Sequence, residues 1–515
     1  MSLKSHETII VIDYGSQYTQ LITRRIREAN VYSEIFSHTV DISEINKKNV
    51  KGIILSGGPM SVYDDDAPKL NPALLDLDVP VLGICYGLQL LCLNFGGKVE
   101  PAKNREYGKA SLQILSENDL LKNVKNNSVV WMSHGDLLTE LPAGFKIIGE
   151  SEHSPFCAIT NEDRKVFGVQ FHPEVVHTQE GKKIINNFLF TICNCKGDWT
   201  TTNFIQEKIN EIKENVGSNK AICALSGGVD STVAAMLVKK AIGNRLVSIH
   251  IDTGLMRKNE SEIVGKLFDT KLKLNHTKVD ASSKFLSALK GVTDPEQKRK
   301  IIGKIFIDVF EEEAKKIGNA KFLVQGTLYP DVIESMQVKG VSATIKSHHN
   351  VGGLPEKMNL KLIEPFRELF KDEVRSVGCE LGIDDEFINR HPFPGPGFAV
   401  RVLGDVTPSR LDILREADDI FIQSIKEAGL YEKIWQAFAV LLPVNTVGVM
   451  GDARTYEFVL SLRAVTSNDG MTADWYQFDH NFLSDVSNKI INRVRGINRV
   501  VYDISSKPPA TIEWE

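Results

Sequence analysis

The sequence lacks both a long apolar run and a strong excess of charge, and each absence excludes a class of protein. Its apolar stretches fall short of the roughly 20 residues that a membrane-spanning helix needs, so we expect no membrane partner. The formal net charge of −5 gives no global positive field, so we expect no nucleic-acid partner. The polar residues before Thr8 lead directly into a strand-like run and do not have the pattern of a signal peptide.

Cysteine is also sparse, and its spacing excludes a common type of metal site. The seven cysteines are scattered, and Cys193 and Cys195 have no second pair to complete a zinc site. We therefore expect no metal at that position. No prosthetic group is expected either. Because the sequence shows neither a signal peptide nor a membrane-spanning stretch, the chain is expected to be cytoplasmic, with reduced thiols.

The composition is that of an ordinary globular protein, 42% hydrophobic and 25% charged, and 515 residues predict two to four domains. Short β-rich runs alternate with helix-period segments over residues 8–170 and again over 220–325. This alternation predicts two α/β domains with open, mostly parallel sheets. The proline- and glycine-rich HPFPGPGF at 391–398 marks the start of a smaller α+β unit. Residues 331–360 are polar and without period, and we predict a lid there. The predicted domains are 7–197, 198–390 and 391–515.

The segment GICYG places Cys85 where an apolar strand turns into an amphipathic helix. The glycines at 83 and 87 permit a sharp turn, and the helix N-terminus favours a thiolate. A proton shuttle is supplied by His172 in the strand VFGVQFHPE, and Glu174 is spaced to orient its imidazole. The pattern predicts a cysteine nucleophile with a base and an orienting acid. The alternative is that Cys85 is a buried core cysteine, that His172 is a satisfied surface histidine and that the glycine turn at 56–59 is an ordinary turn.

An acyl-transfer site also needs hydrogen-bond donors for the developing oxyanion. The turn SGGP presents the amide of Gly57 or Gly58, and the amide of Tyr86 follows the nucleophile. These pieces, in this order, resemble the class I glutamine amidotransferases, which carry G-x-C-x-G at the elbow and H-P-E after a late strand. The resemblance implies glutamine hydrolysis and assigns glutamine-holding positions to Gln89, Ser133 and His134. For Gln89, the alternative is a solvated side chain on an exposed helix face.

A second site is predicted where ALSGGVDST follows an apolar strand and opens a helix. Glycine amides, hydroxyl groups and the helix N-terminus together suit phosphate oxygens. The loop lacks the lysine of a Walker A motif, and its aspartate instead suits a Mg²⁺ beside a departing pyrophosphate. It resembles the loop of N-type ATP pyrophosphatases, which implies ATP as substrate and adenylation of an oxygen. The predicted ATP-binding residues of the loop are Ser226, Gly227, Gly228, Val229, Asp230, Ser231 and Thr232.

Two residues outside this loop are also predicted to serve ATP. Asp252 ends the next strand, where ligands of open sheets bind, although an ordinary helix N-cap would look the same. Lys371 in LFKDEVR follows the predicted lid and is predicted to meet the pyrophosphate. Its alternative is an ordinary surface lysine.

The order of the domains and four further segments resemble the GMP synthetase family over essentially the whole chain. These segments are QGTLYPDVIES, HPFPGPGFAVR, GDARTYE and KPPATIEWE. The resemblance implies that XMP, ATP and glutamine become GMP, AMP, pyrophosphate and glutamate through an adenylated XMP. It also implies a homodimer formed by the third domain, which holds XMP. The implied XMP-binding residues are Arg299, Asp452, Lys507 and Glu513.

Two other functions compete with this interpretation. One is a glutamine-dependent ligase that aminates a different carbonyl, and the C-terminal segments argue against it. The other is a catalytically silent nucleotide-binding regulatory protein. Intact Cys85, His172, Glu174 and Asp230 argue against a silent protein.

Overall fold

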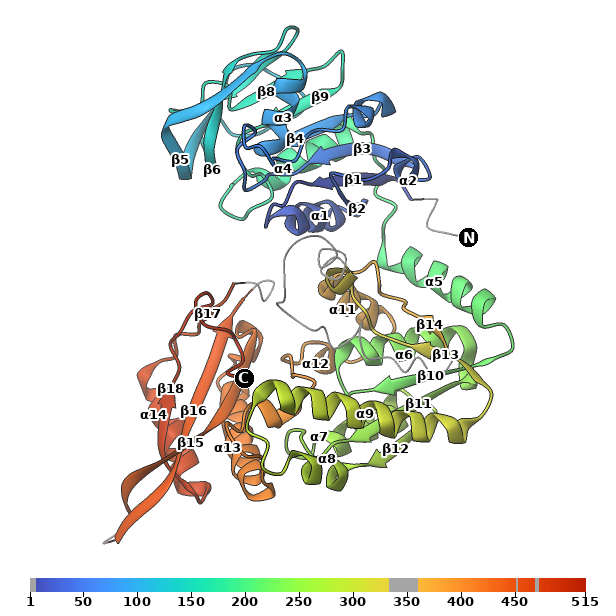
Figure 1. Cartoon of the computed structure of the whole chain (residues 1–515), viewed down its shortest axis with the longest axis vertical. Helices are drawn as coiled ribbons and strands as arrows, with labels where there is room; N and C mark the ends of the chain where they lie inside the picture. Colours follow the sequence, from blue (N-terminus) through green and yellow to red (C-terminus); the bar gives the residue numbers. More distant parts are fainter. Residues whose placement is uncertain (1–5, 333–359, 451–452, 468–471) are drawn as a thin grey trace. The chain divides into compact units, whose positions relative to one another are not determined.

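The computed structural model describes residues 6–332, 360–450, 453–467 and 472–515 (Figure 1). The chain divides into two compact units, Met1–Phe204 and Ile205–Glu515. Almost all of the predicted lid lies outside the described residues. Within the described ranges, no helix is both long enough and apolar enough to cross a membrane.

The first unit is built on a nine-stranded mixed sheet with the order β2-β1-β3-β4-β9-β8-β7-β5-β6. The first five of these strands are parallel, and each later neighbour is antiparallel. Strand bounds are β1 Thr8–Asp13, β2 Tyr32–Ser37, β3 Val50–Leu55, β4 Val81–Ile84, β5 Lys98–Ile114, β6 Ser128–Glu140, β7 Lys146–Glu150, β8 Ala158–Asn161 and β9 Val166–Val169. Its α-helices are α1 Thr19–Glu28, α2 Ile42–Ile45, α3 Tyr86–Asn94 and α4 Gly181–Asn186.

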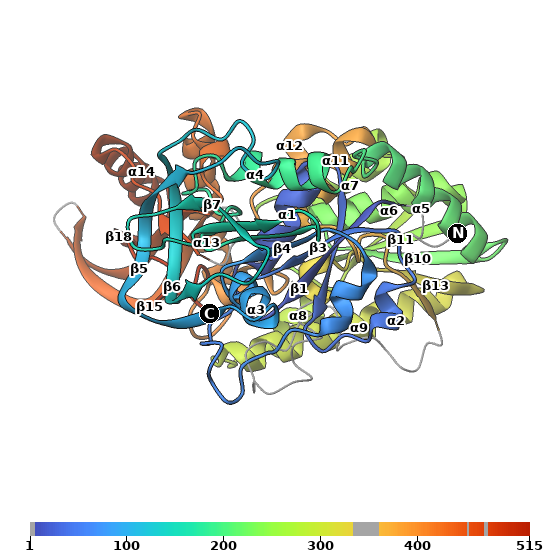
Figure 2. The same ribbon diagram turned by 90° about the horizontal axis from the view of Figure 1, so that it is seen from above.

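Strand β1 shows why helices cover both faces of this sheet. Its side chains alternate between faces, and all of the central ones are apolar. Ile9 and Val11 join an apolar cluster with α1 and α4, whereas Ile10 and Ile12 join another with α2 and α3. Strands β5 and β6 pair as a long ribbon at the sheet edge, visible in Figures 1 and 2. Strands β3, β4 and β9 are parallel neighbours, so their carboxyl ends lie together at one edge of the sheet, where the candidate site is formed.

The second unit contains a five-stranded parallel sheet with the order β12-β11-β10-β13-β14. Strand bounds are β10 Lys220–Leu225, β11 Leu246–Asp252, β12 His276–Asp280, β13 Ala320–Val324 and β14 Lys361–Ile363. The accompanying α-helices are α5 Thr201–Val216, α6 Val229–Ile242, α7 Glu260–Lys266, α8 Ser282–Leu289, α9 Pro295–Ile317, α11 Lys371–Glu380 and α12 Asp385–Ile388. The long α9 begins at a proline and is capped by Asp294, whose side chain accepts from the amide of Gln297.

The C-terminal part of the second unit is a smaller α+β region. A four-stranded sheet is centred on β16, which pairs with β15, β17 and β18. The elements are α13 Pro408–Glu427, β15 Gln436–Met450, β16 Ala453–Thr466, β17 Asp474–Trp475, α14 His480–Arg493 and β18 Ile497–Tyr502. One apolar cluster contains Ile249 of β11, Leu460 of β16 and Phe398, which precedes α13. The C-terminal α+β region therefore packs directly on the parallel sheet. The predicted fold class, two α/β domains with mostly parallel sheets and a smaller α+β unit, is confirmed.

Candidate functional site

Cys85 lies in a strained turn between β4 and α3. Its φ of +53° and ψ of −105° are unusual for a residue with a side chain, and the surrounding hydrogen bonds hold it there. Its amide donates to the carbonyl of Val169 over 2.8 Å, which ties the turn to β9. The neighbouring glycines are required by space, because a Cβ on Gly87 would lie 2.4 Å from the carbonyl oxygen of Leu55. The sequence therefore folds here into the sharp strand-to-helix turn that was predicted.

His172 and Glu174 are brought to the same place by the chain that follows β9. Nδ1 of His172 lies 2.8 Å from Oε1 of Glu174, and both side chains are buried. This hydrogen bond leaves the other ring nitrogen for Cys85. Burial by itself lowers the pKa of His172, but the Glu174 carboxylate and the Cys85 sulfur outweigh burial and hold that pKa well above its usual value. The arrangement favours an imidazolium beside Cys85.

The glycine turn after β3 lies against this triad. A Cβ on Gly57 would be 3.1 Å from Cε1 of His172 and 3.8 Å from Cβ of Cys85, while one on Gly58 would meet the Tyr86 ring at 3.1 Å. Within the described part of the chain, the amides of Gly57, Gly58 and Tyr86 donate to no backbone acceptor. Gly57, one of the three predicted oxyanion donors, therefore lies close to Cys85 and His172, and none of the three amides is used in a backbone hydrogen bond among the described residues.

The predicted glutamine-holding residues are also close to Cys85, through β6. The Sγ of Cys85 lies 3.7 Å from the carbonyl oxygen of Ser133. Gln89 and His134 both reach the carbonyl of Asp136, each over 3.0 Å. Gln89 is only 3% exposed, so the alternative interpretation, a solvated side chain on an exposed helix face, is wrong. The expected amphipathic character of α3 is wrong, because its residues from Tyr86 to Cys92 are all buried.

The second predicted site forms a loop between β10 and α6. Gly227 has φ +80°, which favours glycine, and Gly228 is the N-cap of the 14-residue helix. The loop is held by its own hydroxyls, because Thr232 Oγ1 donates to the Gly228 carbonyl over 2.8 Å and Ser231 Oγ lies 3.1 Å from Ser226 Oγ. The helix N-terminus beside this loop is a suitable position for phosphate.

Asp230 stands in the first turn of α6, facing α11. The Nζ of Lys371 lies 4.0 Å from its Oδ2, so the structure brings these two predicted residues together. Burial raises the pKa of Asp230, and Lys371 and Arg375 oppose that increase. Its Oδ1 is buried without a hydrogen-bond partner among the described residues. Oδ1 of Asp252, in contrast, has a partner in its own loop, because it accepts a hydrogen bond from the amide of Gly254 over 3.0 Å.

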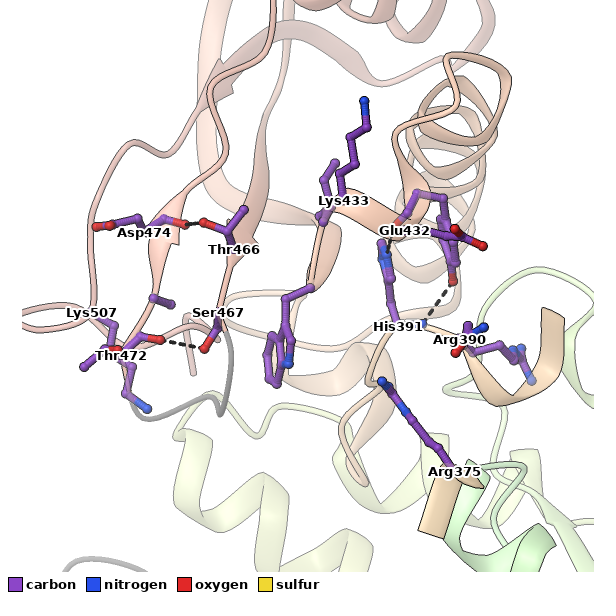
Figure 3. A pocket seen from close by; sticks show the side chains of 15 residues that line it. Arg375, Arg390, His391, Glu432, Lys433, Thr466, Ser467, Thr472, Asp474 and Lys507 are labelled. Atoms are coloured by element: carbon purple, nitrogen blue, oxygen red, sulfur yellow. Dashed lines mark hydrogen bonds between the residues drawn. The ribbon is translucent and has the colours of Figure 1, made fainter. Parts of the chain in front are cut away.

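The predicted XMP residues are distributed around the C-terminal segment. Glu513 accepts two hydrogen bonds from Arg401, at 2.8 and 3.1 Å, and one from Gln436 at 2.8 Å. Arg299 donates to the backbone carbonyl of Glu515. Lys507 lines a pocket with a volume of about 690 Å³, shown in Figure 3. The fourth predicted residue, Asp452, lies outside the described residues.

Comparisons with known proteins agree with this division of sites. Residues 10–192 match the model of class-I glutamine amidotransferases, residues 200–302 that of NAD synthase and residues 423–514 that of the GMP synthase C-terminal domain. Proteins named "GMP synthase [glutamine-hydrolyzing]" from Brachyspira hyodysenteriae and Aquifex aeolicus are 57% and 58% identical to this chain. The matches cover 99% and 98% of this chain, and 99% of each relative. The chain belongs to the GMP synthase family. A third member, from Bartonella henselae, is 55% identical over the full length of both chains.

The structure of this GMP synthase family member adds residues that sequence reasoning missed. Gln170 is fully buried and its Nε2 lies 3.7 Å from Sγ of Cys85. Its position two residues before His172, in the same short segment, was the available signal. Gly326 lies against the phosphate loop, because a Cβ there would be 3.2 Å from the carbonyl carbon of Asp230. No local pattern marked Arg401, which is fully buried and holds Glu513.

Proposed function

We propose that this chain makes GMP from XMP, with ATP as the activating substrate and glutamine as the nitrogen donor. The observation that carries the proposal is full-length identity of 57% to GMP synthases, combined with intact residues at both sites. Family membership supports the overall reaction. The individual roles given below rest on the geometry of the residues.

Glutamine hydrolysis is assigned to Cys85, His172 and Glu174. The thiolate of Cys85 attacks the carboxamide carbon, and the amides of Gly57, Gly58 and Tyr86 are placed to bind the developing oxyanion. His172 then gives its proton to the leaving nitrogen, so that ammonia departs and a thioester remains. Water, deprotonated by His172, attacks the thioester and releases glutamate. Glu174 keeps Nδ1 of the imidazole hydrogen-bonded throughout.

Adenylation is assigned to the loop that opens α6. The glycine amides and the hydroxyls of Ser226, Ser231 and Thr232 are suited to hold ATP phosphates, with Lys371 beside Asp230. The oxygen at C2 of XMP attacks the α-phosphorus, and pyrophosphate leaves. Ammonia then adds at C2, and AMP leaves with that oxygen, giving GMP. Arg299, Asp452, Lys507 and Glu513 are the proposed XMP-binding residues.

Asp230 fits a magnesium ion. Its Oδ1 is a buried carboxylate oxygen at the loop and has no partner within the described ranges, so it is a suitable ligand for this cation. Magnesium prefers oxygen and often shares its coordination with substrate phosphates. We propose that Asp230 holds Mg²⁺ there together with ATP oxygens. When bound, the ion would neutralise charge on the leaving pyrophosphate. Among the described residues, no cluster of three acidic, histidine or cysteine side chains offers an all-protein cage.

The overall proposal is tested by product analysis. With glutamine, ATP and Mg²⁺ present, AMP and pyrophosphate should form in equal amounts with GMP when XMP is added, and neither should accumulate without it. A ligase for a different acceptor would leave XMP unchanged and turn over only with another carbonyl compound. A regulatory protein would bind nucleotide without forming AMP. Either outcome would contradict GMP synthesis.

We also propose that two copies of the chain associate through the β15–β16 hairpin. Four apolar side chains on it are largely exposed: Val444 at 50%, Val447 at 49%, Val449 at 76% and Tyr456 at 65%. The hairpin extends away from the rest of the C-terminal region in Figures 1 and 2. Such a concentration of apolar groups is typical of an interface. Sedimentation equilibrium that gave only the monomer mass at micromolar concentration would exclude a homodimer.

A cytoplasmic location is proposed on the state of the cysteines. All seven cysteines lie within the described residues, and none of them forms a disulfide. Six of the seven are buried. Such thiols are usual where the environment is reducing. Mass spectrometry of alkylated cell extracts tests this, since a disulfide-linked native protein would contradict it.

The raised pKa of His172 leads to a prediction about pH. The imidazolium persists below its raised pKa, so Cys85 keeps a cationic neighbour through neutral pH. Replacing Glu174 with glutamine removes a carboxylate that raises this pKa, so the imidazolium should be lost at a lower pH. We expect iodoacetamide to alkylate Cys85 roughly tenfold more slowly at pH 7, because the thiolate then has no cationic neighbour to stabilise it. The rate at Cys85 would be measured by peptide mass spectrometry from pH 5 to 9.

The matched control for this experiment is Glu152→Gln, a change of the same type at an exposed position of the same unit. In this variant, Cys85 should be alkylated at the wild-type rate across the pH range. An unchanged pH profile in Glu174→Gln, with normal melting, would show that Glu174 does not govern His172.

A further inference from the structure

A buried serine in the first unit, Ser56, joins three elements that meet near Cys85. It directly follows β3 and is fully buried. Its amide donates to the carbonyl of Ile12 in β1 over 3.1 Å, and its carbonyl accepts the amide of Gly87 in α3 over 3.0 Å. These two backbone hydrogen bonds fix the residue between β1 and the helix that follows Cys85. The side chain of Ser56 therefore has a defined place from which to act on the glycine turn that comes next.

The hydroxyl of Ser56 uses both its acceptor and its donor capacity. Its Oγ accepts the backbone amide of Tyr14 over 3.0 Å. The same oxygen donates its proton to the carbonyl of Gly57, 2.8 Å away. A hydroxyl carries a single proton, and a carbonyl can only accept, so the direction of both hydrogen bonds is unambiguous. The carbonyl of Gly57 is thereby held on the side of the turn where Ser56 and Tyr14 lie.

The orientation of this carbonyl decides where the next amide points. The peptide bond between Gly57 and Gly58 is trans, and in a planar trans unit the C=O and N–H bonds point in opposite directions. The amide of Gly58 therefore points away from the Ser56 hydroxyl. It donates to no backbone acceptor in the described part of the chain. The hydroxyl on one side of the peptide thus sets the direction of an available donor on the other side.

The two glycines explain why this peptide needs to be held. A Cβ on Gly57 would lie 3.1 Å from Cε1 of His172, and a Cβ on Gly58 would lie 3.1 Å from the carbonyl oxygen of Tyr14. Close packing therefore favours glycine at both positions. Glycine, however, leaves the backbone more conformational freedom than any other residue, so a peptide between two glycines turns over easily. The hydrogen bond from Ser56 restricts this freedom.

We propose that Ser56 is a positioning residue for glutamine hydrolysis, whose hydroxyl holds the Gly57–Gly58 peptide so that the Gly58 amide faces the carboxamide oxygen of the substrate. The inference rests on the proposed function, because it takes Cys85 to attack a carboxamide. As the S–C bond forms, an electron pair of the C=O bond moves to the oxygen, and the Gly58 amide donates to that oxyanion. Ser56 itself transfers no proton. In the reversed peptide, the Gly57 carbonyl would face the oxyanion and repel it.

The test is Ser56→Ala, assayed as glutamate release with XMP, ATP and Mg²⁺ present. Its kcat should fall roughly tenfold or more, toward the loss of about 10² to 10³ that removal of an oxyanion donor causes. The oxyanion forms only after binding, so KM for glutamine should stay within about twofold of wild type. Iodoacetamide should alkylate Cys85 at the wild-type rate, because that reaction forms no oxyanion. Ser56→Cys, which has a similar shape but a weaker donor, should give an intermediate kcat.

The matched control is Ser33→Ala, which removes another fully buried serine hydroxyl from the same unit. Oγ of Ser33 donates to the carbonyl of Thr23 over 3.0 Å, in β2. This variant should keep the wild-type kcat and KM. If Ser56→Ala does not melt cooperatively, the same comparison is made with Ser56→Cys.

Three results in a folded Ser56 variant would overturn the proposal. An unchanged kcat would show that the hydroxyl is not needed. A higher KM with an unchanged kcat would make Ser56 a ligand of glutamine. Slower alkylation of Cys85 would mean that the serine holds the turn at the nucleophile instead. A wild-type protein that released no glutamate would contradict the proposed function itself, which distinguishes the two failures.

Discussion

Replacing Cys85 with alanine should abolish glutamine-dependent GMP formation while leaving ammonia-dependent formation near the wild-type rate. The thiol is the proposed nucleophile of this turn, and both His172 and Gly57 lie close to it. Without it, the amide bond must be attacked by water directly, and we expect a loss on the order of 10³-fold or more. The phosphate loop belongs to the other compact unit and keeps all of its residues.

Both rates would be measured on the same preparation, with glutamine or with ammonium chloride at pH 8.5. Cys92→Ala is the matched control, because it removes a buried thiol from the same helix, seven residues further on. Both of its rates should stay near those of the wild-type protein, because Cys85 and the phosphate loop are unchanged. If Cys85→Ala lost the ammonia reaction as well, while melting normally, the separation of the two chemistries would be wrong.

Replacing Asp230 with asparagine should have the complementary effect, with loss of both the glutamine-dependent and the ammonia-dependent reaction. Asparagine has the same shape but no charge. It therefore removes the carboxylate that faces Lys371 and whose Oδ1 has no hydrogen-bond partner in the described part of the chain. We expect a loss on the order of 100-fold, the scale for removing one electrostatic contact to a reacting phosphate. The concentration of Mg²⁺ needed for half-maximal rate should rise if this carboxylate holds the ion.

Alkylation of Cys85 in Asp230→Asn should match the wild-type protein, since the change lies outside the glutaminase unit. The charge control is Asp412→Asn, at an exposed aspartate paired with Arg415 in the same unit as Asp230. It should keep both reactions. Full ammonia-dependent activity in Asp230→Asn would show that this aspartate is not needed at the ATP site. It would also contradict its proposed role as a magnesium ligand.

Much of each site could be predicted from sequence because its parts are local. The turn at Cys85 is set by glycines two residues away on each side, and the spacing of His172 and Glu174 is set by one short segment. The loop before α6 combines a strand end, glycines and a helix start within nine residues. Short-range sterics and helix capping act over these distances, so the pattern itself specifies the geometry.

Other parts depended on contacts between residues far apart in the chain. Gln89 is buried because β6 supplies the Asp136 carbonyl 47 residues later, and helical spacing alone does not reveal that partner. The same holds for α3, which shares its apolar cluster with residues of β5 and β6 and is therefore buried on both sides. The expectation of an amphipathic helix failed for this reason.

The sequence by itself determined the family, the two α/β sheets and the identity of the chemical groups, because these follow from local pattern and period. Tertiary structure alone decided which distant groups meet: Gln170 with Cys85, Lys371 with Asp230, and Ser56 with Tyr14. Pairing across a sheet and packing of a helix against it bring together residues separated by tens to hundreds of positions. No local preference encodes those distances, so only the folded chain shows them.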